Sequence, residues 1–275
     1  MKPDLQFTQS NLQDFIDCPR RFELRYLLQL KWPAVQTEPE LEQENHSRQG
    51  QNFHQLVHQH LLGQPVNQLT LQISDPDLQT WWENYLQSEP LAGLPAIHYP
   101  EFILSAPFEG FRLLAKYDLL AIEAGHQAAI IDWKTSRHHP SHQTLQQRAQ
   151  TRLYPFLLVK AGTHVNGGQP IQPEEVEMNY WFAEEPEKPE HFAYSFDQYQ
   201  QDQEFLAGLI HEISQRKLGN LLLTPDEKLC RFCNYRSLCN RGIRPGSLID
   251  LEDEPEPGTE RPFDLDFEQI AEIEY

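Results

Sequence analysis

The sequence predicts an α/β or α+β fold in which helices flank a mixed sheet. Apolar residues recur at helical spacing in the first third of the chain and again after residue 140, while β-prone runs separated by turns fill residues 98–134. A further apolar run at 175–182 adds a strand that is distant in sequence. Such elements bury their apolar faces by packing helices against a sheet. With 275 residues, of which 39% are hydrophobic, the chain can bury one substantial core.

Two short helices are expected near the N-terminus. Ser10 and Gln13 fit a capping box, and the apolar residues that follow them predict a helix that stops at Cys18 and Pro19. Residues 22–30 repeat apolar side chains at helical spacing, which predicts a second helix directly after the first.

Two further helices are expected before the strands. Residues 48–62 place their apolar side chains on one stripe, with His54 and His58 four positions apart on one face, and residues 78–85 show the same periodicity. Two histidines at this spacing could hold zinc, although ordinary amphipathic helices also contain them. The role of His58 stays open.

The middle of the chain predicts an antiparallel meander. The run 98–134 is interrupted at Glu109-Gly110 and again at 123–125, where turn residues separate β-prone segments. Later apolar runs predict, in order, a helix, a strand and a helix at residues 141–160, 175–182 and 197–217.

The net charge of −19 argues against a surface that attracts nucleic acid everywhere. About half of that charge belongs to the last residues, since Asp250 to Tyr275 holds eleven acids and the single base Arg261. Residues 228–244 hold five bases and no acid, so local basic patches are expected. We expect a folded domain over 1–247 and an acidic, disordered tail over 248–275. The absence of a secretory signal or long apolar stretch predicts a cytoplasmic protein without a membrane partner.

A carboxylate and a lysine project together from one predicted strand. Alternation along residues 128–134 places Asp132 and Lys134 on the same face, and Asp118, in a neighbouring apolar run, could meet Asp132 on an adjacent strand. Two carboxylates suit Mg²⁺ or Mn²⁺, which would polarise a phosphate and acidify a water molecule. Lys134 could orient that water or offset charge on the phosphate. An isolated Asp-x-Lys is more often a strand-end ion pair.

The order of these residues resembles the RecB-like branch of the PD-(D/E)XK nuclease superfamily. Five elements of that family occur in family order over most of the chain, from Thr8 to Arg241. They are the helix with Arg48, Gly50, Phe53 and His54, the strand acid Glu101, the second acid Asp118, the run Asp132-Trp133-Lys134, and the helix with Gln150 and Tyr154. Two departures occur: the glycine usual before the second acid is absent, and the arginine of the first helix is displaced to Arg48.

The resemblance implies a restriction-endonuclease-like fold and a role for each matching residue. His54, Asp118 and Asp132 would be metal ligands together with the main-chain carbonyl of Trp133, and Lys134 would be the catalytic lysine. Glu101 would be a further catalytic acid. Gln150 and Tyr154, one helical turn apart, would face the active site and the DNA backbone.

Four cysteines also have motif positions. Cys230, Cys233 and Cys239 form a C-x2-C-x5-C pattern, whereas Cys18 lies about 210 residues earlier. Cytoplasmic proteins seldom keep disulfides, so compact thiolates suggest an iron–sulfur cluster or zinc. Together with the residues around Cys18, the pattern resembles the iron-staple nucleases, which include AddB-type helicase–nuclease subunits and CRISPR-adaptation exonucleases. That resemblance implies a [4Fe-4S] cluster that joins the two ends, with a DNA path near Arg20, Arg21, Arg231 and Arg236.

The resulting hypothesis is a Mg²⁺- or Mn²⁺-dependent deoxyribonuclease. The resemblance favours an exonuclease on single-stranded or frayed duplex ends, acting in DNA repair, recombination or CRISPR adaptation with a helicase or CRISPR-adaptation protein as partner. One alternative is a non-catalytic DNA-binding or scaffold module that keeps the fold. Another is a zinc-stapled protein, which would lack the brown colour of an iron–sulfur protein.

Overall fold

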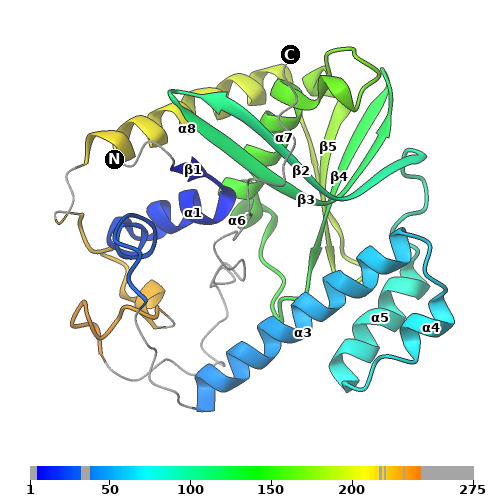
Figure 1. Ribbon diagram of the computed structural model, residues 1–275, viewed down its shortest axis with the longest axis horizontal. Coiled ribbons are helices and arrows are strands. Elements are labelled where there is room, and N and C mark those ends of the chain that lie inside the picture. The colour runs from blue at the N-terminus through cyan, green and yellow to red at the C-terminus, as the bar shows by residue number, and fades with distance from the viewer. Residues whose placement is uncertain (1–4, 32–37, 217–218, 220, 232, 243–275) are drawn as a thin grey trace.

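The computed structural model describes residues 5–31, 38–216, 219, 221–231 and 233–242, and gives only the backbone for 38–44. Within these residues six strands form one mixed sheet with helices against both faces, which confirms the expected fold class (Figure 1). The strands are β1 (Gln6–Phe7), β2 (Ile97–Phe108), β3 (Phe111–Glu123), β4 (Gln127–Lys134), β5 (Val176–Phe182) and β6 (Glu190–Ala193). The predicted tail lies outside the described residues.

Strand β3 is the centre of the sheet. Its whole length pairs with antiparallel β2, from Phe111 opposite Phe108 to Ile122 opposite Ile97. Its other edge is shared, because β1 runs parallel to its first residues and β4 runs antiparallel to its last ones. Strands β4 and β5 are parallel, and β6 completes the order as an antiparallel partner of β5. Residues 114–118 of β3 therefore pair with neither β1 nor β4 along this edge, and the site described below lies there.

The helices divide over the two faces of the sheet (Figure 1). One hydrophobic cluster contains residues of α1, α7 and α8 with one face of the strands, and the second contains residues of α3, α4 and α5 with the other face. The helices are α1 (Gln9–Asp17), α2 (Pro19–Phe22), α3 (Glu38–Leu61), α4 (Val66–Thr70), α5 (Pro76–Ser88), α6 (His142–Gln146), α7 (Ala149–Ala161) and α8 (Phe196–Gln215).

Several boundaries differ from the sequence prediction. The capping box of α1 is formed by Thr8 and Asn11, whose side chains each accept from the other's backbone N–H, so its assignment to Ser10 and Gln13 was wrong. The second helix continues from α2 into a π-helical turn, η1 (Glu23–Leu27). The helix expected over 141–160 is divided into α6 and α7 between Gln146 and Ala149. Strands β1 and β6 and helix α4 were not predicted.

The two ends of the domain are joined by hydrogen bonds across the whole sequence. The Arg20 N–H donates to the Leu222 carbonyl at 3.2 Å. The Tyr235 hydroxyl donates to the Leu30 carbonyl at 2.8 Å. None of the described helices is both long and apolar enough to cross a membrane.

Candidate active site

Strands β3 and β4 bring two carboxylates together where the strands begin to separate. Their last paired residues in this direction are Leu119 and Ile131, so Asp118 and Asp132 are the next residues along. Instead of a regular ladder bond, the Trp133 N–H donates to Asp118 Oδ2 at 2.9 Å. Asp118 therefore occupies the position that a main-chain acceptor would take in a regular sheet, which fixes its carboxylate beside β4.

The expected alternation along β4 is confirmed. Ile130 belongs to the cluster on the α7 face, whereas Ile131 and Trp133 belong to the cluster on the α3 face. Asp132 and Lys134 share the face of Ile130, and Lys134 Nζ lies 2.7 Å from Asp132 Oδ2.

Gln150 of α7 holds this pair in place. Its side-chain amide donates to Asp132 Oδ1, and its carbonyl oxygen accepts from Lys134 Nζ at 3.0 Å. Asp132 is only 4% exposed. The three side chains thus form a closed polar network, so the orientation of the lysine is fixed before any substrate binds.

Glu101 lies opposite Asp118 at an irregularity shared by β2 and β3. Pro100 pairs with Leu119 and Phe102 with Tyr117, while Glu101 has a left-handed φ of 54°. The alternation of both strands changes phase here: Tyr117 and Leu119, two positions apart, belong to clusters on opposite faces of the sheet. A left-handed non-glycine residue inside a strand is strained, and such strain is concentrated at functional sites.

Helix α3 supplies His54 from the opposite face of the sheet. His54 Nδ1 lies 3.3 Å from Asp118 Oδ1. Gly50, one turn earlier, permits this approach, because a Cβ at that position would lie 2.7 Å from Thr135 Oγ1. Ligand atoms of His54, Glu101 and Asp118 lie within 4.8 Å of one another, the one such metal-compatible group among the described residues.

The electrostatics of the site indicate an accumulation of negative charge. Burial would lower the pKa of His54, but Asp118, with smaller effects of Asp132 and Glu101, raises it to about 9. Burial opposes ionisation of Asp118, yet His54 and the Trp133 N–H outweigh it and lower its pKa. Burial raises the pKa of Asp132 to about 6 against the lowering effect of Lys134, and Asp118 adds to the rise. A cation between these carboxylates would relieve their repulsion.

Comparison with known proteins assigns the chain to a family. A profile of the PD-(D/E)XK nuclease superfamily matches residues 6–240. The chain belongs to the PD-(D/E)XK nuclease superfamily. No curated protein matches it.

One solved structure shares the fold of the chain. A protein named "Putative exonuclease" from Eubacterium rectale has a TM-score of 0.51 and 13% identity, covering 89% of this chain and 91% of its own. At that identity the likeness shows the fold alone. A structure of SSO0001 covers 85% of both chains at a TM-score of 0.39 and 11% identity, which is too low to carry an argument.

Two residues expected at the superfamily site have different surroundings. Tyr154 is 1% exposed, and its hydroxyl donates to the Lys116 carbonyl at 2.8 Å, so it supports β3 from behind the site. A contact of Tyr154 with DNA stays a prediction. Trp133 contacts Asp118 through its N–H, while a role for its carbonyl also stays a prediction. His58 is partly buried one turn after His54 and is not in the metal-compatible group.

The sequence analysis did not identify Lys116 in this candidate site. Its ammonium group forms an ion pair with Glu101 Oε2. The residue lies two positions before Asp118 on β3, which is the same spacing that identified Lys134 beside Asp132. That spacing was the available signal, but the strand irregularity between Lys116 and Asp118 could not be read from it.

The four cysteines lie at the junction of the two chain ends. Cys18 follows α1, Cys230 ends the short 3-10 helix η4 (Glu227–Cys230), and none of the four is disulfide-bonded. Burial, and then the neighbouring Cys233, Cys18 and Cys239, raise the pKa of the Cys230 thiol to about 11. In the described chain Cys18 thus lies near the three late thiols. That the four hold one cluster stays a prediction.

The arginines around these cysteines have mostly internal partners. Arg21 pairs with Asp14 and Asp17 at 2.7 Å each, and Arg20 pairs with Glu23. Arg236 is 4% exposed and donates to the Cys233 carbonyl at 3.2 Å, whereas Arg231 is exposed. These contacts brace the cysteine segments. DNA binding by the four arginines stays a prediction.

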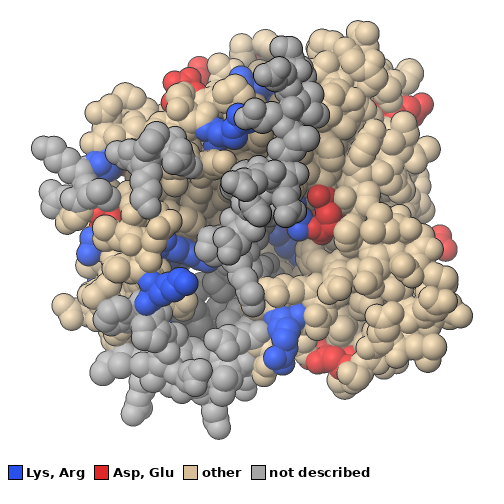
Figure 2. Space-filling model, viewed as in Figure 1, with Lys and Arg blue, Asp and Glu red and all other residues tan. Residues whose placement is uncertain are grey.

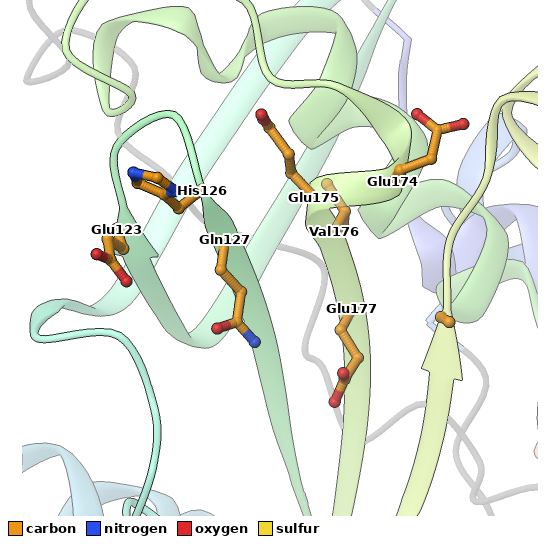
Figure 3. Close-up of a pocket in the computed structure, with 8 residues that line it drawn as sticks. Glu123, His126, Gln127, Glu174, Glu175, Val176 and Glu177 are labelled. Carbon is orange, nitrogen blue, oxygen red and sulfur yellow. The ribbon is translucent and has the colours of Figure 1, made fainter.

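An open pocket of about 360 Å³ lies at the opposite end of β4 and β5 from Asp132 (Figure 3). Its lining includes Glu123, Glu174, Glu175 and Glu177. None of the candidate catalytic residues lines it. Four carboxylates would repel a phosphate backbone, so a DNA substrate is not expected to bind in this pocket.

Proposed function

We propose that this protein is a metal-dependent DNA nuclease that hydrolyses phosphodiester bonds. The observation that carries the proposal is the convergence of two adjacent groups where β3 and β4 separate. His54, Glu101 and Asp118 form the first group, and Asp132, Lys134 and Gln150 form the second. Membership of a nuclease superfamily supports the same activity.

The two groups have different chemical tasks. His54, Glu101 and Asp118 would hold Mg²⁺ or Mn²⁺, with Asp132 completing the set from β4. The bound metal supplies Lewis acidity and lowers the pKa of a coordinated water. Lys134, held by Gln150, would place a positive charge beside the reacting phosphate and its attacking water. Asp132 keeps the ammonium group of Lys134 charged and fixed within a buried setting.

The substrate is DNA, and the preferred site of attack is a single-stranded or frayed end. This follows from the resemblance of the sequence to iron-staple exonucleases, which also suggests a role in DNA repair, recombination or CRISPR adaptation beside a helicase or adaptation protein. The charge distribution supports a nucleic-acid surface. On the face shown in Figure 2, Lys and Arg side chains lie over its middle and left, with one acidic group beside the central ones and another among those on the left.

The four cysteines would hold a [4Fe-4S] cluster that joins the two ends of the domain. Cys18, Cys233 and Cys239 each contribute to the raised pKa of the Cys230 thiol, so the early thiol lies near the late ones. The preference for iron–sulfur over zinc rests on the resemblance of the sequence to iron-staple nucleases.

The proposed function is tested with protein purified without oxygen and supplied with Mn²⁺. Linear single-stranded DNA, end-blocked duplex and circular DNA are compared for the parent, Asp132→Ala and Lys134→Ala. The parent should degrade free ends, and each variant should lose at least about a hundredfold in rate while retaining its fold. Cleavage by both variants at the parental rate would exclude this site. DNA binding without cleavage by the parent would instead indicate a non-catalytic module.

A further inference from the structure

The proposed metal site contains three acids, and each is paired with a basic side chain. Asp118 is paired with His54, Asp132 with Lys134, and Glu101 with Lys116. In the metal-free protein the acidic site is thus neutralised by side chains. A divalent ion that enters must replace some of these pairs, and its affinity depends on which pair is given up.

The pair between Glu101 and Lys116 is the most exposed of the three, since the His54 and Asp118 side chains are 31% and 14% exposed. The side chains of Lys134 and Asp132 are 20% and 6% exposed and are also hydrogen-bonded to Gln150. The side chains of Lys116 and Glu101 are 32% and 21% exposed, so water is available to both when they separate.

The backbone around Lys116 is fixed even though its side chain reaches the surface. Its carbonyl accepts from the buried Tyr154 hydroxyl, and it is paired with Ile103 of β2. Glu101 is held in its left-handed conformation by the same strand pairing. Only the lysine side chain needs to move for Glu101 to change partners.

We propose that Lys116 is an internal competitor for the metal site, whose ammonium group holds the Glu101 carboxylate until a divalent ion takes it. This inference rests on the proposed metal-dependent function. It assigns Lys116 a positioning role that sets the metal concentration at which the site fills. It also explains why a lysine stands two residues before Asp118, where a positive charge is unfavourable for a bound cation.

The test is a titration of the purified protein with Mn²⁺ in the absence of DNA. Binding is measured by calorimetry or from the electron paramagnetic resonance signal of free Mn²⁺. Lys116→Gln should bind Mn²⁺ roughly three- to tenfold more tightly than the parent, because a positive charge near the ion is removed. Lys116→Arg, which keeps the charge, should retain affinity close to that of the parent. Lys160→Gln, on an exposed part of α7, controls for the change in net charge.

A second readout uses thermal unfolding. In EDTA, Lys116→Gln should unfold at a lower temperature than the parent, since Glu101 then lacks its counter-charge beside Asp118. With saturating Mn²⁺ that difference should close or reverse. In a Glu101→Gln background, Lys116→Gln should no longer tighten Mn²⁺ binding, because the carboxylate for which the two cations compete is absent.

The outcomes separate this inference from the proposed function. If the parent binds Mn²⁺ and Asp118→Asn loses that binding, the metal site stands. Equal or weaker Mn²⁺ binding by Lys116→Gln would then overturn the role of Lys116 alone. If neither the parent nor any variant binds Mn²⁺, the metal-dependent function itself is overturned.

Discussion

Glu101 combines a left-handed backbone conformation with a place in the metal-compatible group. Its φ of 54° lies in the left-handed region, which costs a non-glycine residue about 1 kcal/mol or more. The surrounding ladder of β2 and β3 holds it there, opposite Asp118. At this conformation the side chains of both strands change the face of the sheet on which they alternate. The Glu101 carboxylate of β2 thereby joins the metal-compatible group.

A comparison of two substitutions at this residue measures that strain. Glu101→Gly should have a free energy of unfolding about 1 kcal/mol higher than Glu101→Ala, since glycine accepts a positive φ without a steric penalty. Both variants lack the carboxylate and its pair with Lys116, so these losses cancel in the comparison. Urea unfolding in EDTA provides the measurement. Equal stability of the two variants would show that the left-handed conformation carries no strain.

Asp132 should destabilise the metal-free fold at neutral pH. Burial raises its pKa to about 6, above the ordinary value of 3.8. The folded state therefore binds the Asp132 proton more tightly than the unfolded state does. The resulting contribution to the free energy of unfolding is complete below pH 4 and is lost as the pH rises through 6. In EDTA at pH 7.5, Asp132→Asn should be more stable than the parent by about 1–3 kcal/mol, with the gap closing near pH 4.

Lys134→Met provides the control of opposite sign for this pH dependence. It removes the compensating charge 2.7 Å from Asp132, so its stability should fall further than that of the parent between pH 4 and 7. Chemical unfolding between pH 4 and 7.5 measures the free energy of unfolding of both variants and the parent. An Asp132→Asn variant that is less stable than the parent at pH 7.5 would show that the ion pair with Lys134 outweighs burial.

At the scale of elements, periodicity predicted most of the scaffold but not its irregularities. The strands β2 to β5 and helices α3, α5 and α8 follow apolar patterns that local side-chain burial enforces. The break between α6 and α7 could not be predicted, because the helix-forming pattern continues through it. The phase change at Glu101 and Asp118 was equally hidden, since it depends on how β2 pairs with β3.

Helix α3 depends on Gly50 for its position at the site. A Cβ there would meet Thr135 Oγ1 at 2.7 Å, just beyond the end of β4. Gly50→Ala should favour the isolated helix, yet it should displace α3 and carry His54 away from Asp118. We expect Mn²⁺ affinity and cleavage rate to fall about tenfold or more, with a smaller effect on stability.

The double variant Gly50→Ala/Thr135→Ala isolates that contact. Removal of the Thr135 side chain makes room for the new methyl group, so Mn²⁺ affinity should return toward that of Thr135→Ala alone. Both affinities are measured by calorimetry without DNA. A double variant as impaired as the sum of the two single changes would place the defect elsewhere than in this contact.

At the scale of the whole molecule, the sequence indicated that distant ends meet, but not how they are held. The resemblance to iron-staple nucleases implied the association of Cys18 with the C-terminal cysteines. It gave no sign of the hydrogen bonds from Arg20 to Leu222 and from Tyr235 to Leu30. It also suggested surface arginines for DNA, whereas Arg21 and Arg236 are largely committed to contacts inside this junction. Long-range partners of this kind depend on the folded arrangement of both ends.

The proposed cluster should act as one cross-link that needs ligands from both ends. Closing a loop of about 200 residues restricts the unfolded chain by on the order of 5 kcal/mol in the polymer model, which is an upper value. Cys239→Ala should therefore lose iron and brown colour and unfold at a lower temperature. Its cleavage rate should fall because the scaffold loosens, and added Mg²⁺ should restore little of it. Residual association of the ends is expected from their hydrogen bonds.

Cys18→Ala, from the other end of the chain, is the matched variant. If both cysteines serve one cluster, the two single variants should be equally destabilised, and the double variant should be no worse than either, because the cross-link can be lost only once. Iron content, thermal midpoint and cleavage rate are measured on the same oxygen-free preparations. Independent zinc or thiol sites would give additive losses and colourless parent protein. A colourless Cys239→Ala with parental stability and activity would show that the cysteines do not hold the ends together.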